Sequence, residues 1–148
     1  MKENSEKIVC QNKKAYHDYF IEDMIECGIV LTGTEIKSIR LSKVNIQDCY
    51  CSIDKGEMYV IGMHISPYDK GNIFNHQPDA NRKLLLHKRE IIRLGSKVMR
   101  DGYTLVPLRV VLRGGIAKVD IGLAKGKKLY DKREDLKTRE ALRQTKEG

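Results

Sequence analysis

Short stretches in which apolar residues alternate with polar ones, or follow one another without a break, dominate this chain, and such stretches favour strands. Strands are predicted over eight segments of three to ten residues: Lys7–Asn12, Tyr16–Ile25, Gly28–Leu31, Asp48–Ile53, Glu57–Ile65, Leu84–Leu86, Thr104–Arg113 and Ile116–Leu123. Turn formers at residues 54–56 and 114–115 connect two pairs of these strands and predict hairpins. Pro107 has no N–H to donate, so its strand is expected at a sheet edge or at a bulge.

Two other segments have apolar residues at helical spacing. A helix is expected to begin at Thr32, because Thr32 and Glu35 form the pattern of a capping box. A second helix is predicted over Lys88–Asp101, with one apolar face and with Gly102 directly after it as a stop. The polar segment Ser66–Arg82 is rich in turn formers and predicts a loop. Together these elements predict a mainly β protein with helices, a small antiparallel OB-type β-barrel with two flanking helices.

The character of the sequence changes near Lys125. From there onward apolar residues are too sparse for a packing face, and charged residues dominate. We therefore divide the chain into an OB-type barrel domain, residues 1–124, and a basic C-terminal tail, residues 125–148. The tail is expected to be disordered in the free protein, with a helical tendency from Arg133 to Gln144.

Charge is segregated along the chain, which carries 28 Lys and Arg against 20 Asp and Glu. Residues 82–100 hold seven basic residues and one acidic residue, whereas residues 18–26 hold four acids and no base. Such segregation favours a polyanionic partner. A nucleic acid fits better than a membrane, because neither basic segment has a broad apolar face. With no apolar leader near the N-terminus, the protein is expected in the cytoplasm.

Motifs for catalysis are missing from the sequence. The four His residues are scattered, there is no G-x-S-x-G elbow, and no phosphate-binding glycine loop precedes a helix. The four Cys residues match no zinc-binding spacing, so we expect free thiols and no metal or other cofactor. Trp is absent and there are only two Phe, which disfavours a long base-stacking groove for single strands. A structured RNA is the better candidate ligand.

Five segments of the chain resemble segments of one known protein family and follow in the same order. They lie at Asn12–Ile21, Gly28–Ser38, His64–Tyr68, Arg82–Glu90 and Gly122–Arg133. These segments are similar to the SsrA-binding protein family (small protein B, SmpB), and the resemblance extends from about Lys7 to the end of the chain.

The resemblance implies an OB-type barrel that binds transfer-messenger RNA (SsrA RNA), acts as a monomer and has no catalytic site. Members of the family carry this RNA to stalled ribosomes, where the nascent chain is tagged and the ribosome is released in trans-translation. The tail is implied to enter the empty mRNA channel near the decoding site of the small-subunit ribosomal RNA and to form a helix there. The alternative is a general structured-RNA or ribosome-binding OB-fold protein. A nuclease or RNA-modifying enzyme on the same fold is a third possibility.

Site residues follow from the same resemblance, position by position. RNA contacts are implied at four positions with basic neighbours at four more: Asn12, Glu26, Leu85 and His87, then Lys13, Lys14, Arg82 and Lys83. A carboxylate at position 26 must accept hydrogen bonds from base edges or a 2′-hydroxyl, because phosphate repels it. On the sequence alone the favoured interpretation of Glu26 is a solvated acid and that of Leu85 is a core residue, whereas His87 fits the start of a helix as well as a neutral stacking group.

The tail has its own motif residues, which the resemblance assigns to the ribosome: Gly126, Lys127, Lys128, Tyr130, Asp131, Lys132 and Arg133. Tyr130 is an aromatic side chain among cations and can stack on a base once the tail is ordered. Many relatives carry His at this position. A generic charged terminus is the alternative interpretation.

Overall fold

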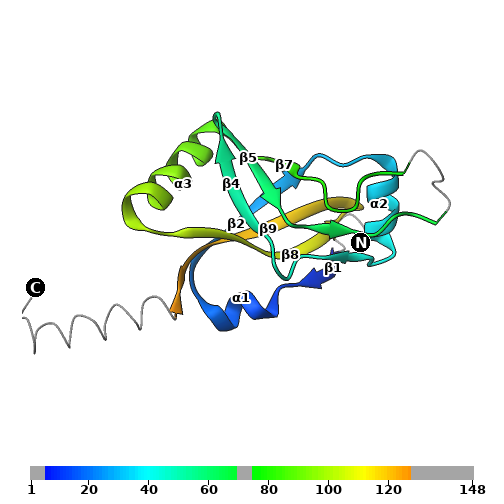
Figure 1. The fold of residues 1–148 in the computed structure, drawn as a ribbon, viewed down its shortest axis with the longest axis horizontal. Helices are drawn as coiled ribbons and strands as arrows, with labels where there is room; N and C mark the ends of the chain where they lie inside the picture. The colour runs from blue at the N-terminus through cyan, green and yellow to red at the C-terminus, as the bar shows by residue number, and fades with distance from the viewer. Residues whose placement is uncertain (1–5, 70–74, 128–148) are drawn as a thin grey trace, which may run out of the picture.

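The computed structural model describes residues 6–69 and 75–127 of the chain, and strands predominate in both ranges (Figure 1). The elements follow in this order: β1 (Glu6–Gln11), α1 (Lys13–Asp18), β2 (Tyr19–Ile29), α2 (Gly33–Arg40), β3 (Val44–Asn45), β4 (Tyr50–Asp54), β5 (Glu57–Ile61), β6 (His64–Ile65), β7 (Arg82–Leu85), α3 (Lys88–Asp101), β8 (Thr104–Arg113) and β9 (Ile116–Gly126). None of the helices in these ranges is long and apolar enough to cross a membrane.

Seven of the described strands form one antiparallel sheet in the order β1-β8-β9-β2-β7-β5-β4, and β3 pairs with β6 in a separate ladder. The sheet is coiled, so that β4 lies against β8, but it keeps two end strands, β1 and β4 (Figure 1). The prediction of a mainly β, antiparallel fold is confirmed. The OB-type barrel is not confirmed, because the described strands form a sheet that is not closed.

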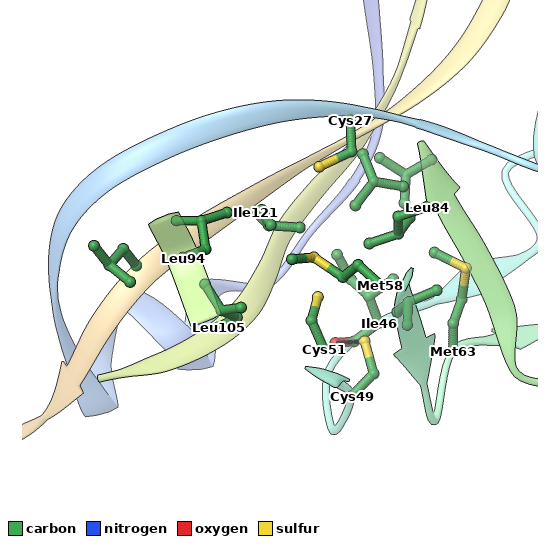
Figure 2. Packing of buried hydrophobic residues seen from close by; sticks show 14 of the residues in the cluster. Cys27, Ile46, Cys49, Cys51, Met58, Met63, Leu84, Leu94, Leu105 and Ile121 are labelled. Carbon is green, nitrogen blue, oxygen red and sulfur yellow. Dashed lines mark hydrogen bonds between the residues drawn. The ribbon is translucent and has the colours of Figure 1, made fainter. Parts of the chain in front are cut away.

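The main core lies on the inner face of the coiled sheet, where alternate residues of the long strands are apolar. Cys27 of β2 and Ile121 of β9 belong to it, and Leu94 brings α3 onto the same cluster (Figure 2). A second, smaller cluster lies under α1, where Ala15 packs with Leu108. Each fully buried Leu or Ile contributes about 1.5–3 kcal/mol, so these two clusters hold α1 and α3 against the sheet.

Local sequence signals define the ends of α2 and α3. At α2 the capping box is present: Thr32 N–H donates to Glu35 Oε1 at 2.7 Å, and Glu35 N–H donates to Thr32 Oγ1 at 3.4 Å. Helix α3 spans the predicted residues, and Gly102 ends it in the left-handed conformation with φ 73°. Both helix predictions are confirmed.

The strand predicted over Tyr16–Ile25 is wrong in its first part. Residues 13–18 form the six-residue helix α1, and β2 begins only at Tyr19. Asn12 caps this helix, because its Oδ1 accepts a hydrogen bond from Ala15 N–H at 3.1 Å. A helix this short is not stable by itself, so the cap and the burial of Ala15 are what stabilise it. The described part of the chain therefore has three helices where the sequence predicted two.

A bulge at Pro107 and a break at Gly62 bear on the predicted strands. The β8–β9 register shifts between Pro107 and Arg109, and because β8 lies between β1 and β9, Pro107 sits at a bulge and not at an edge. The strand predicted over Glu57–Ile65 is divided at Gly62, whose φ is 91°. A Cβ at Gly62 would also lie 3.2 Å from the Cα of Cys49, so both the backbone angle and the space require glycine there.

Candidate nucleic-acid interface

A hollow of about 470 Å³ lies where β2, β7 and β9 meet the beginning of α3. Its walls combine apolar side chains with charged ones: Ile25, Glu26, Gly28, Leu85, Leu86, His87, Glu90 and Lys118. We call this hollow the β2–β7 pocket. It brings together three of the residues that the sequence analysis selected, Glu26, Leu85 and His87. Glu26 lies on β2, Leu85 ends β7 and His87 is the N-cap of α3, so the fold brings together two segments that are about 60 residues apart in the sequence.

Strand alternation explains why Leu85 faces solvent. Leu84 points into the core and is 1% exposed, so the next side chain of β7 points outward and Leu85 is 51% exposed. Leu85 pairs with Gly28 of β2, and a Cβ at Gly28 would lie 3.3 Å from the Leu85 Cβ. Since Gly28 has no side chain, Leu85 can lie directly over the β2 backbone. An exposed apolar side chain beside bare backbone gives a surface on which a flat base can stack.

Glu26 reaches the same pocket by the same alternation. Cys27 points into the core at 1% exposure, and the Glu26 side chain is 48% exposed on the opposite face of β2. Across the ladder Glu26 is paired with Asp120 of β9. Arg113 Nη1 lies 3.2 Å from Glu26 Oε2. The carboxylate is therefore held on one side and accessible on the other.

Lys118 is a pocket residue that the sequence analysis did not select. It lies on β9 opposite Gly28, on the same face as Asp120, and it has no ion-pair partner among the described residues. The alternation of Lys118 and Asp120 with the buried Val119 and Ile121 was visible in the sequence and could have indicated an outward cation. His87 precedes α3 as its N-cap, and its side chain makes no cap hydrogen bond.

Asn12 lies inside the protein, at 3% exposure, and its amide group bonds to the protein's own backbone. Besides accepting from Ala15, its Nδ2 donates to Ile46 O at 3.2 Å and to Pro107 O at 3.1 Å. These bonds tie β1, α1, β8 and the segment after β3 together. They occupy both amide protons and one acceptor site, which leaves little of this side chain for a ligand.

Arg82 is also buried, at 3% exposure. Its Nε donates to Glu35 Oε2, and its two terminal nitrogens donate to backbone carbonyls of four residues: Met63, Gln77, Pro78 and Ala80. All five N–H groups of a guanidinium are thus matched by acceptors within the protein. Sequence reasoning counted Arg82 with the basic RNA-facing residues, whereas the fold uses it to hold residues 77–80 against α2.

The other basic positions are exposed or half-buried, but they do not line the β2–β7 pocket. Lys14 lies 3.7 Å from Asp48 and borders a second hollow of about 220 Å³, which Asn12 also lines. Lys83 lies 3.4 Å from Glu57. Lys13 is exposed at the beginning of α1. Exposed pairs of this kind contribute about 0–1 kcal/mol, so RNA phosphates can compete for these cations at little cost.

Of the seven tail motif residues, only Gly126 and Lys127 fall within the described residues. Gly126 pairs with Tyr19 at the end of β9. Lys127 Nζ donates to Tyr16 O at 3.3 Å and lies 5.2 Å from the centre of the Phe20 ring. The remaining positions lie outside the described residues: Lys128, Tyr130, Asp131, Lys132 and Arg133.

Some of the charged residues in the acidic and basic segments pair with other residues of the protein. On the acidic strand β2, Glu22 accepts a hydrogen bond from the Tyr103 hydroxyl, and Asp23 lies 3.7 Å from Arg93 of α3. Together with Arg82, this means that the basic segment 82–100 is less available to a polyanion than its sequence charge suggests. The charge pattern alone therefore overstates the cationic surface that a polyanion can reach.

The cysteines are free thiols, as predicted, and three of the four are buried. Burial raises the pKa of Cys10 to about 11 and the pKa values of Cys27 and Cys49 to about 12, so none of these thiols is a nucleophile near neutral pH. Within residues 6–69 and 75–127 no three His, Cys, Asp or Glu side chains gather in a way that could hold a metal ion. What the described site offers is a binding surface.

Comparisons with known proteins indicate one family. The model of a family described as SmpB protein matches residues 9–148. An SsrA-binding protein of Geotalea uraniireducens (strain Rf4) is 57% identical over 139 residues, 94% of this chain and 92% of its own. One from Ruminiclostridium cellulolyticum is 59% identical over 138 residues, 93% of this chain and 90% of its own. A chain in a solved structure described as "tmRNA-SmpB: a journey to the center of the bacterial ribosome" superposes with a TM-score of 0.66 at 46% identity, covering 80% of this chain and 83% of that chain.

Proposed function

Because this chain belongs to the SmpB protein family, we propose that it binds transfer-messenger RNA and delivers it to stalled ribosomes for trans-translation. The relatives named SsrA-binding protein and the related structure on the bacterial ribosome support both partners. The observation that carries the proposal is the β2–β7 pocket, where Glu26, Leu85 and His87 line one hollow.

The pocket combines three kinds of contact that a folded RNA with a few unstacked bases requires. Leu85 and the bare backbone at Gly28 provide an apolar platform for one base, and the carboxylate of Glu26 accepts hydrogen bonds from a base edge or a 2′-hydroxyl. Lys118 supplies a positive charge for a phosphate at the rim. His87, at the beginning of α3, can stack on or hydrogen-bond to the same nucleotide. The hollow accommodates a splayed nucleotide and is too small for a duplex.

Asn12 and Arg82 support RNA binding indirectly in this proposal. Asn12 holds α1, which carries Lys13 and Lys14, and Arg82 contributes through the stability of the fold, because it holds residues 77–80 against α2. Lys83, which alternates on β7 with the same outward face as Leu85, meets a phosphate near the pocket, and Lys13 and Lys14 meet phosphates beside the second hollow. The coiled sheet then acts as an OB-type binding platform, with the outer face of β2, β7 and β9 toward the RNA.

Binding alone accounts for this function, so we propose no catalytic step. The competing possibility is a nuclease or RNA-modifying enzyme. Incubation of the purified protein with labelled RNA and Mg²⁺ separates the two, since an RNA-binding adaptor leaves the RNA intact. A cleaved or altered RNA would support the enzyme.

The tail, residues 125–148, is proposed to act on the ribosome and not in RNA binding. Replacing Asp131, Lys132 and Arg133 together with Ala should leave RNA affinity within about twofold of the wild type, because the pocket is unchanged. The same variant should lose tagging of chains on ribosomes stalled at an mRNA end. Tagging at the wild-type rate would show that these tail residues do not act on the ribosome.

The proposed function is tested by recovering the full-length protein from bacterial cells and sequencing the RNA that copurifies with it. One dominant RNA species with a tRNA-like part is expected. A broad mixture of ribosomal and messenger RNA would favour the general RNA-binding alternative instead.

A further inference from the structure

Five charged side chains form a network across four neighbouring strands on the outer face of the sheet. We call it the charge ladder, and its members are Glu6 of β1, Arg109 and Arg113 of β8, Asp120 of β9 and Glu26 of β2. Arg113 occupies its centre. Its guanidinium contacts all three carboxylates, at 3.2 Å from each of Glu6, Asp120 and Glu26.

Arg113 contacts Glu26 although its own strand, β8, does not pair with β2. Strand β9 lies between them, so the Arg113 side chain extends across β9 to reach Glu26. On the way it bonds to Asp120, which is buried and also accepts a hydrogen bond from Arg109 Nε at 2.7 Å. Asp120 thus fixes the guanidinium, and the guanidinium in turn fixes Glu26.

Glu26 needs such a partner for two reasons. Its cross-strand neighbour is Asp120, and like charges directly opposite each other in a sheet repel. An RNA phosphate near the pocket would add a further repulsion. Arg113 compensates for both and takes only Oε2, whereas Oε1 has no partner among the described residues.

We infer that Arg113 is a positioning residue for RNA recognition, which holds the Glu26 carboxylate through Oε2 so that Oε1 faces the bound nucleotide. This inference rests on the proposed function of the β2–β7 pocket. It requires an arginine, because Nη1 contacts both Asp120 Oδ1 and Glu26 Oε2 while Nη2 contacts Glu6 and Asp120 Oδ2. A lysine ammonium is a single point and cannot bridge these carboxylates in the same geometry.

The fold itself does not depend on Arg113 alone. Asp120 keeps Arg109 when Arg113 is replaced, and the Arg113 side chain is partly exposed at the sheet surface. Arg113→Met and Arg113→Lys are therefore expected to fold, which circular dichroism and urea unfolding verify. A loss of RNA binding in a folded variant is then attributable to the pocket.

The test is a double-mutant cycle on affinity for the tRNA-like part of transfer-messenger RNA, measured by fluorescence anisotropy. The variants are Arg113→Met, Glu26→Gln and the two together. Arg113→Met should weaken binding about tenfold and, in the Glu26→Gln background, less than twofold, because there is no longer a carboxylate to position. Arg113→Lys should restore only part of the loss. Arg100→Met is the matched control, since it removes the same charge about 18 Å along α3 from the pocket end.

Two outcomes would overturn the inference in different ways. If Arg113→Met weakens binding equally in the wild-type background and in the Glu26→Gln background, Arg113 acts on RNA independently of the carboxylate, and the proposed function stands. If Glu26→Gln itself binds RNA as tightly as the wild type, the pocket role of Glu26 fails, and the inference fails with it. If Arg100→Met weakens RNA binding as much as Arg113→Met does, the loss of affinity reflects the net charge of the protein and not the position of Arg113. That result would also overturn the inference.

Discussion

Replacing Arg82 with Met tests whether the buried ion pair between α2 and β7 is structural. The substitution keeps an unbranched apolar side chain and removes the guanidinium. Glu35 would then remain buried with only the Thr32 N–H as a partner among the described residues. Four backbone carbonyls at positions 63, 77, 78 and 80 would lose their donor at the same time.

The expected cost is large. Breaking a buried ion pair by removing one partner costs about 3–5 kcal/mol, because an uncompensated charge stays behind. The whole domain is stabilised by about 5–15 kcal/mol, so Arg82→Met removes a major share of the stability. Glu35→Gln should cost less, since Arg82 keeps its four carbonyl acceptors and the single amide oxygen can still accept a hydrogen bond from either Thr32 N–H or Arg82 Nε. In the double variant the two losses should fall well short of adding, because both substitutions break the same contact.

Urea unfolding followed by circular dichroism measures this loss of stability directly. The free energy of unfolding falls by about 2 kcal/mol per M of urea, so the unfolding midpoint of Arg82→Met should lie about 2 M below that of the wild type. RNA affinity measured well below that midpoint should stay within about threefold of the wild type, because Arg82 does not reach the surface. A variant that unfolds at the wild-type midpoint yet binds RNA much more weakly would refute the reasoning and make Arg82 a direct RNA contact.

Three further predictions concern the pocket, the charge ladder and the thiols. Gly28→Ala should weaken RNA binding several-fold with little loss of stability, because the new Cβ would displace the Leu85 side chain that lies 3.3 Å away; wild-type affinity in a titration would contradict this. Burial alone would raise the pKa of Asp120, but hydrogen bonds from its two arginines lower it below the ordinary value of 3.8. The stabilising effect of the Asp120 carboxylate is therefore complete above about pH 3.8 and is lost as the pH falls through the depressed pKa. As the pH is lowered from 7 to 2, the free energy of unfolding should fall more steeply for the wild type than for Asp120→Asn. Parallel profiles for the two proteins would contradict this prediction. Because burial raises the pKa values of Cys27 and Cys49 to about 12, a disulfide reagent at pH 8 should modify them only at the rate of unfolding, and rapid modification of the native protein would contradict their burial.

Elements with a local signal could be predicted from the sequence. The capping box at Thr32, the stop at Gly102 and the glycine pair at 114–115 each act within a few residues, and the structure has an element boundary at each. Helix α1 has a weaker local signal, the N-cap Asn12 alone, and Tyr16 and His17 are as compatible with a strand. Its stability depends on the cap, on the burial of Ala15 and on the bonds of Asn12 to residues far along the chain.

The direction of a side chain in the candidate site could be predicted only where the alternation of a strand determines which face the side chain lies on. Glu26 and Lys118 alternate with buried neighbours, so their outward direction follows from the strand period. Leu85 lies within three consecutive leucines, and nothing in that run tells which of them faces solvent. The burial of Arg82 could not be predicted either, because its anionic partner Glu35 is 47 residues away and its carbonyl partners lie in an irregular segment.

The central claim is that the β2–β7 pocket binds the tRNA-like part of transfer-messenger RNA, and the most direct test compares two leucines. Leu85 lines the pocket, whereas Leu41 follows α2, borders a different hollow and is about equally exposed. Full burial of a leucine side chain contributes about 1.5–3 kcal/mol and Leu85 is already half-buried, so Leu85→Ala should weaken binding of the labelled RNA about fivefold in a titration at constant salt. Leu41→Ala should bind within about twofold of the wild type, because its hollow is not the proposed site. Equal affinities for the two variants, or a larger loss with Leu41→Ala, would contradict the assignment of the pocket.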